Sequence, residues 1–184
     1  MARHPIPTGR EITFAPDDVI VSKTDLQGKI TYVNDVFVAV SGYTPAELLG
    51  APHSLIRHPD MPRCVFKVLW NTIAQRREIF AYVLNMAKDG AHYWVLAHVT
   101  PSYDRAGRHV GYHSHRRAPW ADALAKVKPL HAKLLSVERA HTDRSMGLAA
   151  SVRLVEQLLV EQAMEWDEFV FSLSAETRVD AAVG

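Results

Sequence analysis

The fold is decided by residues 19–33, which read Val-Ile-Val-Ser-Lys-Thr-Asp-Leu-Gln-Gly-Lys-Ile-Thr-Tyr-Val. Both ends of this stretch are rich in β-branched residues, and its middle contains Gly28. Two such runs around a glycine turn are typical of an antiparallel β-hairpin. The sequence therefore predicts that the folded part of the chain begins with two paired strands.

Helical spacing replaces this pattern directly after the hairpin. Apolar residues recur at helical spacing between Val36 and Tyr43. The run Thr44-Pro-Ala-Glu then offers a capping hydroxyl, a proline at the first helical position and a glutamate at the third, which together favour a helix start. We expect two short helices between residues 34 and 50.

A loop, a longer helix and a second set of strands complete the core. Prolines break up residues 51–62, so we expect a loop there. Helical spacing resumes from about 61 to 74. Three β-prone runs follow at 79–86, 93–99 and 109–115, and glycine-containing turns separate them, which is typical of an antiparallel meander.

This order of elements predicts an α+β fold. Two strands, several short helices and three strands indicate a five-stranded antiparallel sheet with short helices on one face, followed by C-terminal helices. We divide the chain into an N-terminal arm at 1–17, a core domain at 18–118, a helical output or dimerisation region at 119–173, and a disordered tail at 174–184.

The C-terminal region carries a regular apolar stripe. Positions 148, 152, 155, 159, 162, 166, 169 and 173 alternate spacings of four and three residues, and only Gln162 among them is polar. This seam predicts one helix from about 143 to 173. The stripe needs a partner: the core, a helix around 121–139, or a second copy of the chain. We predict a homodimer through these helices.

Composition excludes several classes of protein. The 184 residues hold 21 Lys and Arg against 20 Asp and Glu, a formal charge of +1, so we expect no nucleic-acid partner. No stretch approaches the roughly 20 apolar residues of a membrane span, so we expect no membrane insertion. The single cysteine, Cys64, fits a reducing, cytoplasmic setting. No catalytic motif is present, and we expect no enzyme.

The sequence resembles a known family of sensors. Thr24-Asp-Leu-Gln-Gly28 and Asn34-Asp-Val-Phe37 resemble the opening of a PAS domain. Arg57-His-Pro-Asp-Met-Pro62 and Tyr93-Trp-Val95 resemble, more narrowly, the PAS domain of bacterial aerotaxis receptors. The resemblance covers about residues 20–117. It implies the PAS fold, a non-covalently bound FAD, and a sensor of redox state and oxygen that signals through C-terminal helices to a downstream protein.

Candidate cofactor residues follow from the resemblance and from side-chain chemistry. Arg57, His58 and Asp60 form a proline-braced group of donors and one acceptor, suited to the polar groups of a dinucleotide. Trp70 offers a flat face, and the Asn85 amide can donate or accept; Asn85 points inward if Val83 does, because the two share a strand face. The full set implied by the resemblance is Asn34, Arg57, His58, Asp60, Phe66, Trp70, Asn85 and Trp94.

Other interpretations remain at this stage. Without the resemblance, Arg57, His58 and Asp60 could be a solvated loop with a local ion pair. His113 and His115, with His98 opposite, suggest a metal site or a haem-binding gas sensor. A PAS interaction module without any cofactor is a third alternative. Cys64 lacks the sequence context of a photoadduct cysteine, so we expect it to be a small helix residue.

Overall fold

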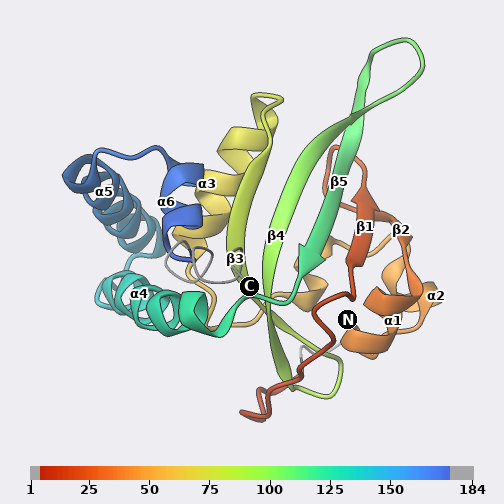
Figure 1. Cartoon of the computed structure of the whole chain (residues 1–184), viewed down its shortest axis with the longest axis horizontal. Coiled ribbons are helices and arrows are strands. Elements are labelled where there is room, and N and C mark those ends of the chain that lie inside the picture. Colours follow the sequence, from red (N-terminus) through yellow and green to blue (C-terminus); the bar gives the residue numbers. More distant parts are fainter. Residues whose placement is uncertain (1–4, 175–184) are drawn as a thin grey trace, which may run out of the picture.

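A five-stranded antiparallel sheet forms the centre of the protein, with the strand order β2-β1-β5-β4-β3 (Figure 1). The computed structural model describes residues 5–174. Its strands are β1 (Ile20–Thr24), β2 (Ile30–Val33), β3 (Ile79–Met86), β4 (His92–Tyr103) and β5 (His109–Arg117). The predicted hairpin and meander are therefore confirmed, and β1 pairs with β5 to join them.

Short helices connect the hairpin to the meander. They are α1 (Asp35–Ser41), α2 (Pro45–Leu48), a 3-10 turn η1 (His53–Ile56) within the predicted loop, and α3 (Arg63–Ala74). The Asn34 side chain caps α1, and Thr44 with Glu47 forms a complete capping box on α2. These local hydrogen bonds satisfy the free N–H groups of each first turn, which is why short helices start where the sequence predicts them.

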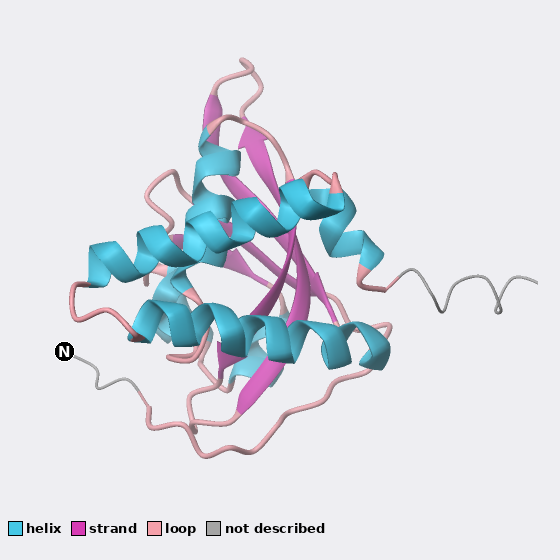
Figure 2. Cartoon of the chain, turned by 90° about the vertical axis from the view of Figure 1, so that its left-hand side faces the viewer, coloured by secondary structure: helices cyan, strands magenta, loops and turns pink. Residues whose placement is uncertain are grey.

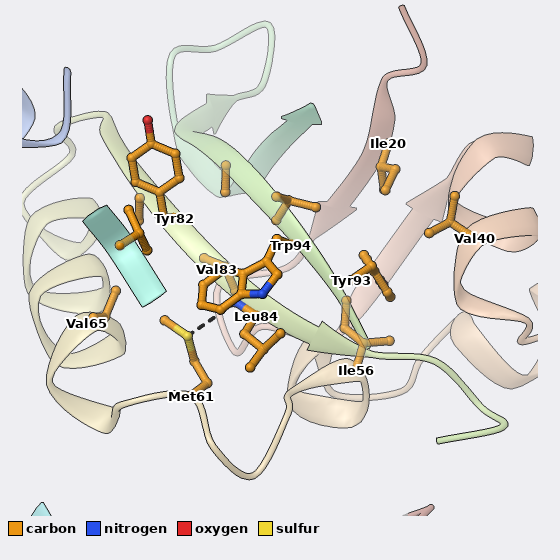
Figure 3. Packing of buried hydrophobic residues seen from close by; sticks show 14 of the residues in the cluster. Ile20, Val40, Ile56, Met61, Val65, Tyr82, Val83, Leu84, Tyr93 and Trp94 are labelled. Carbon is orange, nitrogen blue, oxygen red and sulfur yellow. Dashed lines mark hydrogen bonds between the residues drawn. The ribbon is translucent and has the colours of Figure 1, made fainter. Parts of the chain in front are cut away.

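The hydrophobic core lies between the sheet and the helices (Figure 3). Ile20, Phe37, Ile56 and Tyr93 are fully or almost fully buried there. Met61 adds a polar contact, since its Sδ accepts a hydrogen bond from the Leu84 backbone N at 3.3 Å. This contact ties the loop before α3 to strand β3.

Strand β3 is an edge strand, and two segments cover its free edge. Near its end, Arg57 forms an isolated bridge with Asn85. Near its start, Trp166 Nε1 donates to the Phe80 carbonyl at 2.7 Å, and the Phe80 N–H donates to Asp167 at 3.0 Å. Covering an edge in this way blocks pairing with other strands. One strand thus contacts both the Arg57 loop and the end of the chain.

Three helices follow the sheet and fold back on it (Figures 1 and 2). They are α4 (Ala121–Arg139), α5 (Arg144–Gln162) and α6 (Trp166–Ser172). The prediction of one helix over 143–173 is wrong, because the chain breaks at Ala163, which adopts a left-handed conformation with φ 50°. The break lets α6 turn back onto β3.

The apolar stripe is covered within the chain. Leu148, Val152, Leu159, Trp166 and Leu173 are partly buried against the core, while Val155 and Phe169 are buried. The stripe was the reason to expect a homodimer, and packing on the core and on α4 now accounts for it. No helix within residues 5–174 is both long and apolar enough to cross a membrane.

The described part of the N-terminal arm is docked on the sheet. Thr8 N donates to the Gly90 carbonyl at 2.9 Å, and Ile12 N donates to the His92 carbonyl at 2.8 Å. Gly90 is required here, because a Cβ at this position would lie 2.1 Å from the Ile6 carbonyl oxygen. Apart from Ser174, the predicted disordered tail lies outside the described residues.

Candidate functional site

A cavity of about 290 Å³ lies between the sheet, η1 and α3. That volume is near the lower end of the range for small-molecule sites. Exposed Gln27, Pro52, Ser54 and Trp70 mark its opening, and buried Ser22, Ala97, Asn85 and Arg116 line its inner side. The other lining residues are Thr24, Gly28, His53, Arg57, Phe66, Leu69, Ile73, Val83, Val99, Tyr112 and Ser114.

Flat side chains form the outer part of the cavity. Trp70 on α3 meets Tyr112 edge to face, with ring centres 5.8 Å apart. Its indole also lies over the β1–β2 turn, where a Cβ on Gly28 would come within 2.9 Å of Trp70 Cη2. The Arg57 guanidinium stacks over the Phe66 ring at 3.7 Å. These faces suit a planar aromatic ligand.

Asn85 lies on the cavity side of β3, as the alternation with Val83 predicts, and both residues line the cavity. Asn85 is 3% exposed, and its Nδ2 has no hydrogen-bond partner. Arg57 Nε is likewise buried without a partner. Buried donors are normally paired, so this wall of the cavity offers two unused donors to a ligand.

Burial also sets the protonation states of the inner cavity. It lowers the pKa of His53 to about 3, with the charges of Arg116 and Arg57 acting in the same direction. It raises the pKa of the Tyr93 hydroxyl. Both groups are therefore neutral near pH 7. The Arg116 guanidinium stays protonated there, although burial lowers its pKa to about 10.

Four of the eight predicted cofactor residues line the cavity, namely Arg57, Phe66, Trp70 and Asn85, and the other four do not. The Asn34 amide is bonded to the backbone: it accepts from Val21 N and Phe37 N and donates to the Val19 carbonyl.

Trp94 lies on the opposite face of the sheet from the cavity. It packs against His131 of α4 with ring centres 5.4 Å apart. Its neighbours on β4, Ala97 and Val99, line the cavity instead, which follows from the alternation of side chains along a strand. Trp94 therefore joins the sheet to the C-terminal helices.

His58 and Asp60 flank Arg57 without reaching the cavity. His58 is buried, meets His92 edge to face, and accepts a hydrogen bond from Asp60 N at 3.0 Å. The exposed Asp60 carboxylate pairs with Arg139 of α4 at 2.6 Å. The structure gives these two residues a part in bracing the loop that presents Arg57.

Sequence reasoning missed the contribution of β5. Tyr112, Ser114 and Arg116 line the cavity, so the intervening His113 and His115 point to the other face. Period-two alternation on this strand was the signal that could have found them. His98 is the register partner of His115, as suggested, but no group of three or more metal-ligating side chains occurs within residues 5–174.

A second polar cluster lies where α3 meets the C-terminal helices. The Glu138 carboxylate accepts hydrogen bonds from Arg63 Nε at 2.8 Å, Cys64 N at 2.9 Å and the Ser151 hydroxyl at 3.0 Å. We call this set the Glu138 junction. Cys64 is buried there, does not line the cavity, and has its thiol pKa raised to about 11, chiefly by burial.

Comparisons with known proteins agree with this architecture. The family model described as the PAS fold matches residues 30–115. The chain is 42% identical to the aerotaxis receptor of Escherichia coli over 148 residues, which are 80% of this chain and 29% of that protein. It is 34% identical to a nitrogen fixation regulatory protein of Klebsiella pneumoniae over 89 residues, covering 48% of this chain and 18% of the relative.

Solved structures show the same fold. The light-state structure of the LOV domain of the blue-light photoreceptor Aureochrome1 superposes with a TM-score of 0.50 at 26% identity, covering 69% of this chain and 94% of that one. The chain spans less than a third of the length of the two curated relatives named above.

Proposed function

Since the chain belongs to the PAS family, in the type that the bacterial aerotaxis receptor represents, we propose that it is a sensor module that binds FAD non-covalently. In this proposal the module reports redox state, and so oxygen, to a downstream signalling protein through its C-terminal helices. A cytoplasmic setting belongs to the same proposal, and it fits a chain whose single cysteine, Cys64, allows no intrachain disulfide.

One observation carries the proposal: a cavity walled by flat side chains and by buried donors that have no partner. Trp70 and Phe66 provide the flat surfaces, while Asn85 Nδ2 and Arg57 Nε provide the free donors. A flavin ring is planar and carries carbonyl and ring-nitrogen acceptors, so it matches both features. The cavity volume of about 290 Å³ suits the ring, and the dinucleotide would extend through the opening.

Each residue of the cavity has a definable part in binding. Trp70 and Phe66 supply contact area, and Arg57 supplies a charged donor that its stacking on Phe66 holds in place. His58 and Asp60 brace the Arg57 loop. When bound, a flavin supplies reversible electron uptake that changes which ring atoms donate and accept hydrogen bonds. The Asn85 amide can match either state by rotating about its terminal torsion.

The position of Asn85 suggests how the signal leaves the site. Asn85 lies near the end of the edge strand β3, and Phe80 at the start of that strand is hydrogen-bonded to Trp166 and Asp167 of α6. A rearrangement at Asn85 would act on the same strand that holds α6. We propose that β3 carries the redox state of the ligand to the C-terminal helices.

A visible absorption spectrum of the purified protein, with mass spectrometry of the released chromophore, tests the proposal. We expect a flavin spectrum and the mass of FAD. Trp70→Ala should lower FAD occupancy through lost contact area, whereas Trp120→Ala, at a tryptophan that is 61% exposed and outside the cavity, should not. A Soret band would favour the haem alternative, and a protein that binds no flavin after reconstitution would end the proposal.

The homodimer remains part of the proposal, although the apolar stripe no longer supports it. Packing within the chain accounts for the stripe, but Met146, Val160 and Phe171 of α5 and α6 remain 61%, 79% and 40% exposed. Exposed apolar side chains on neighbouring helices can form a contact between copies. Light scattering should give twice the mass of one chain, and Val160→Glu should lower it. A monomer mass at high protein concentration would contradict the dimer.

A further inference from the structure

Among residues 5–174, Arg116 is the largest side chain that is fully buried, at 2% exposure. It lies near the end of β5, and its side chain lines the inner side of the cavity. Its guanidinium lies over the Phe37 ring at 4.6 Å, and its Nη2 donates to the Ser22 hydroxyl. Its Nε and Nη1 atoms have no hydrogen-bond partner. Two nitrogen atoms of a buried cation are therefore left without an acceptor.

No negative charge in the cavity compensates this cation. The residues that line the cavity include two arginines, Arg57 and Arg116, and neither aspartate nor glutamate. His53 and Tyr93, which interact electrostatically with Arg116, are neutral near pH 7 because burial opposes their charged forms. Burying an unpaired charge costs several kcal/mol in proteins. The fold bears this cost beside the cavity.

We propose that Arg116 determines which ligand the cavity accepts, by donating to the electron-rich edge of a planar ring that carries adjacent carbonyl and ring-nitrogen acceptors. This inference rests on the proposed function and deepens it, since the pyrimidine edge of a flavin has this chemistry. Arg116 would hold that edge at the inner side of the cavity. The apolar side chains of Leu69, Ile73 and Val99 line another part of the cavity wall. They would contact the part of the ring that has no acceptors.

A purely structural role for Arg116 does not explain its unpartnered nitrogen atoms. Packing on Phe37 and one hydrogen bond to Ser22 would orient the guanidinium, but a methionine or leucine fills such a place at lower cost. Orientation by Phe37 and Ser22 leaves Nε and Nη1 without partners. A charged hydrogen bond contributes about 1.5–3 kcal/mol, so a ligand acceptor at this position would change binding by roughly tenfold to a hundredfold.

The test compares FAD binding by the full chain and its variants after removal of the bound chromophore. Kd is measured from quenching of flavin fluorescence, and the midpoint potential by spectroelectrochemical titration. Arg116→Met should weaken FAD binding at least about tenfold and lower the midpoint potential, because the nearby positive charge favours electrons on the ring. Arg116→Lys should restore part of both. Arg117→Met removes an exposed cation from the next residue of the strand and should change neither.

A ligand analogue provides a second arm that does not depend on how well one variant folds. A 1-deazaflavin replaces one ring nitrogen acceptor of the pyrimidine edge with a C–H group. The unchanged protein should prefer riboflavin to 1-deazariboflavin, and Arg116→Met should lose that preference. Equal Kd values and potentials for Arg116→Met and the unchanged protein would overturn the inference and leave the proposed function standing. Failure of the unchanged protein to bind any flavin would overturn both.

Discussion

The cavity and the Glu138 junction are both buried polar clusters, but they differ in how their polar atoms are partnered. At the junction, both carboxylate oxygens of Glu138 accept hydrogen bonds, from Arg63, Cys64 N and Ser151. In the cavity, atoms of Arg57, Asn85 and Arg116 have no partner. Helix α3 contributes residues to both clusters, with Arg63 and Cys64 of its first turn at the junction and Phe66, Leu69, Trp70 and Ile73 at the cavity.

This difference indicates which cluster serves the fold and which serves a ligand. A buried polar group without a partner costs about 1–3 kcal/mol, and a fully paired network costs far less. The protein completes the junction with its own side chains. The cavity donors have no acceptor within the described chain, which agrees with the proposal that a ligand supplies one. Substitutions in the two clusters should therefore have effects of opposite sign on the protein without ligand.

The largest effect is expected at the junction. Glu138→Ala removes the acceptor for three donors, and the Cys64 N–H and the Ser151 hydroxyl stay buried. We expect a loss of about 3 kcal/mol in the free energy of unfolding, measured by urea denaturation. Arg139 lies on the same helix as Glu138 and forms an exposed ion pair with Asp60. Arg139→Ala breaks that pair and should cost less than about 1 kcal/mol. Similar losses for both variants would show that the junction is not the stabilising cluster.

The junction should also make stability depend on pH. Burial tends to raise the pKa of Glu138, but hydrogen bonds from Arg63 and the Cys64 N–H outweigh it and hold the pKa below its ordinary value. A carboxyl whose pKa is lowered on folding stabilises the protein above its unfolded pKa, and this contribution disappears as the pH falls through the folded pKa.

The measurement is urea denaturation of the unchanged protein and Glu138→Gln between pH 7 and pH 3. The unfolding free energies should differ by about 2 kcal/mol at pH 7 and begin to converge as the pH falls below about 4.5, the ordinary pKa of this carboxyl. A difference that stays constant over this range would show that ionisation of Glu138 contributes nothing.

The sequence predicts one of these clusters in part and the other not at all. Val83 and Asn85 could be placed in the cavity because strand alternation is a local property. The same rule applies to β5, where Arg116 lies two residues after Ser114 and both line the cavity. The prediction for this strand concerned only His113 and His115. The Glu138 junction joins residues about 75 positions apart. No local sequence pattern around Glu138 indicates that its carboxylate will accept hydrogen bonds from the first turn of α3.

The capping box of α2 and the break at Ala163 also differ in whether the local sequence predicts them. Thr44 and Glu47 form their capping box from four consecutive residues, so sequence alone sufficed. The chain breaks at Ala163 without glycine or proline, and the reason lies in distant contacts: Trp166 and Asp167 bond to Phe80. Tertiary contacts decide the break, whereas the prediction of a single long helix rests on the spacing of apolar residues alone.

A moderate effect of opposite sign is expected in the cavity. Arg116→Met removes a buried cation that has no counter-charge, so the ligand-free protein should become more stable by about 1 kcal/mol. Arg117→Met, on the exposed side of the same strand, should change stability by less than about 0.5 kcal/mol. Thermal and urea unfolding of the ligand-free proteins measure both. Destabilisation by Arg116→Met of the size expected for Glu138→Ala would show that Arg116 is completed by the fold.

The smallest effect concerns how the cavity communicates with the C-terminal helices. Two backbone N–H groups donate to carboxylates of those helices: Cys64 N–H to Glu138 at 2.9 Å, and Phe80 N–H to Asp167 at 3.0 Å. The first reports on α3 and the second on β3. Hydrogen exchange at these two amides therefore separates a signal that leaves through α3 from one that leaves through β3.

If the redox state acts through Asn85, the Phe80 amide should respond, because both residues belong to β3. We expect reduction of bound FAD by dithionite to change exchange at Phe80 about threefold, which corresponds to about 0.6 kcal/mol of local opening energy, while Cys64 changes much less. Asn85→Ser should remove the response at Phe80 without altering exchange at Cys64. An equal response at both amides would mean that α3, which touches both the cavity and the junction, carries the signal instead.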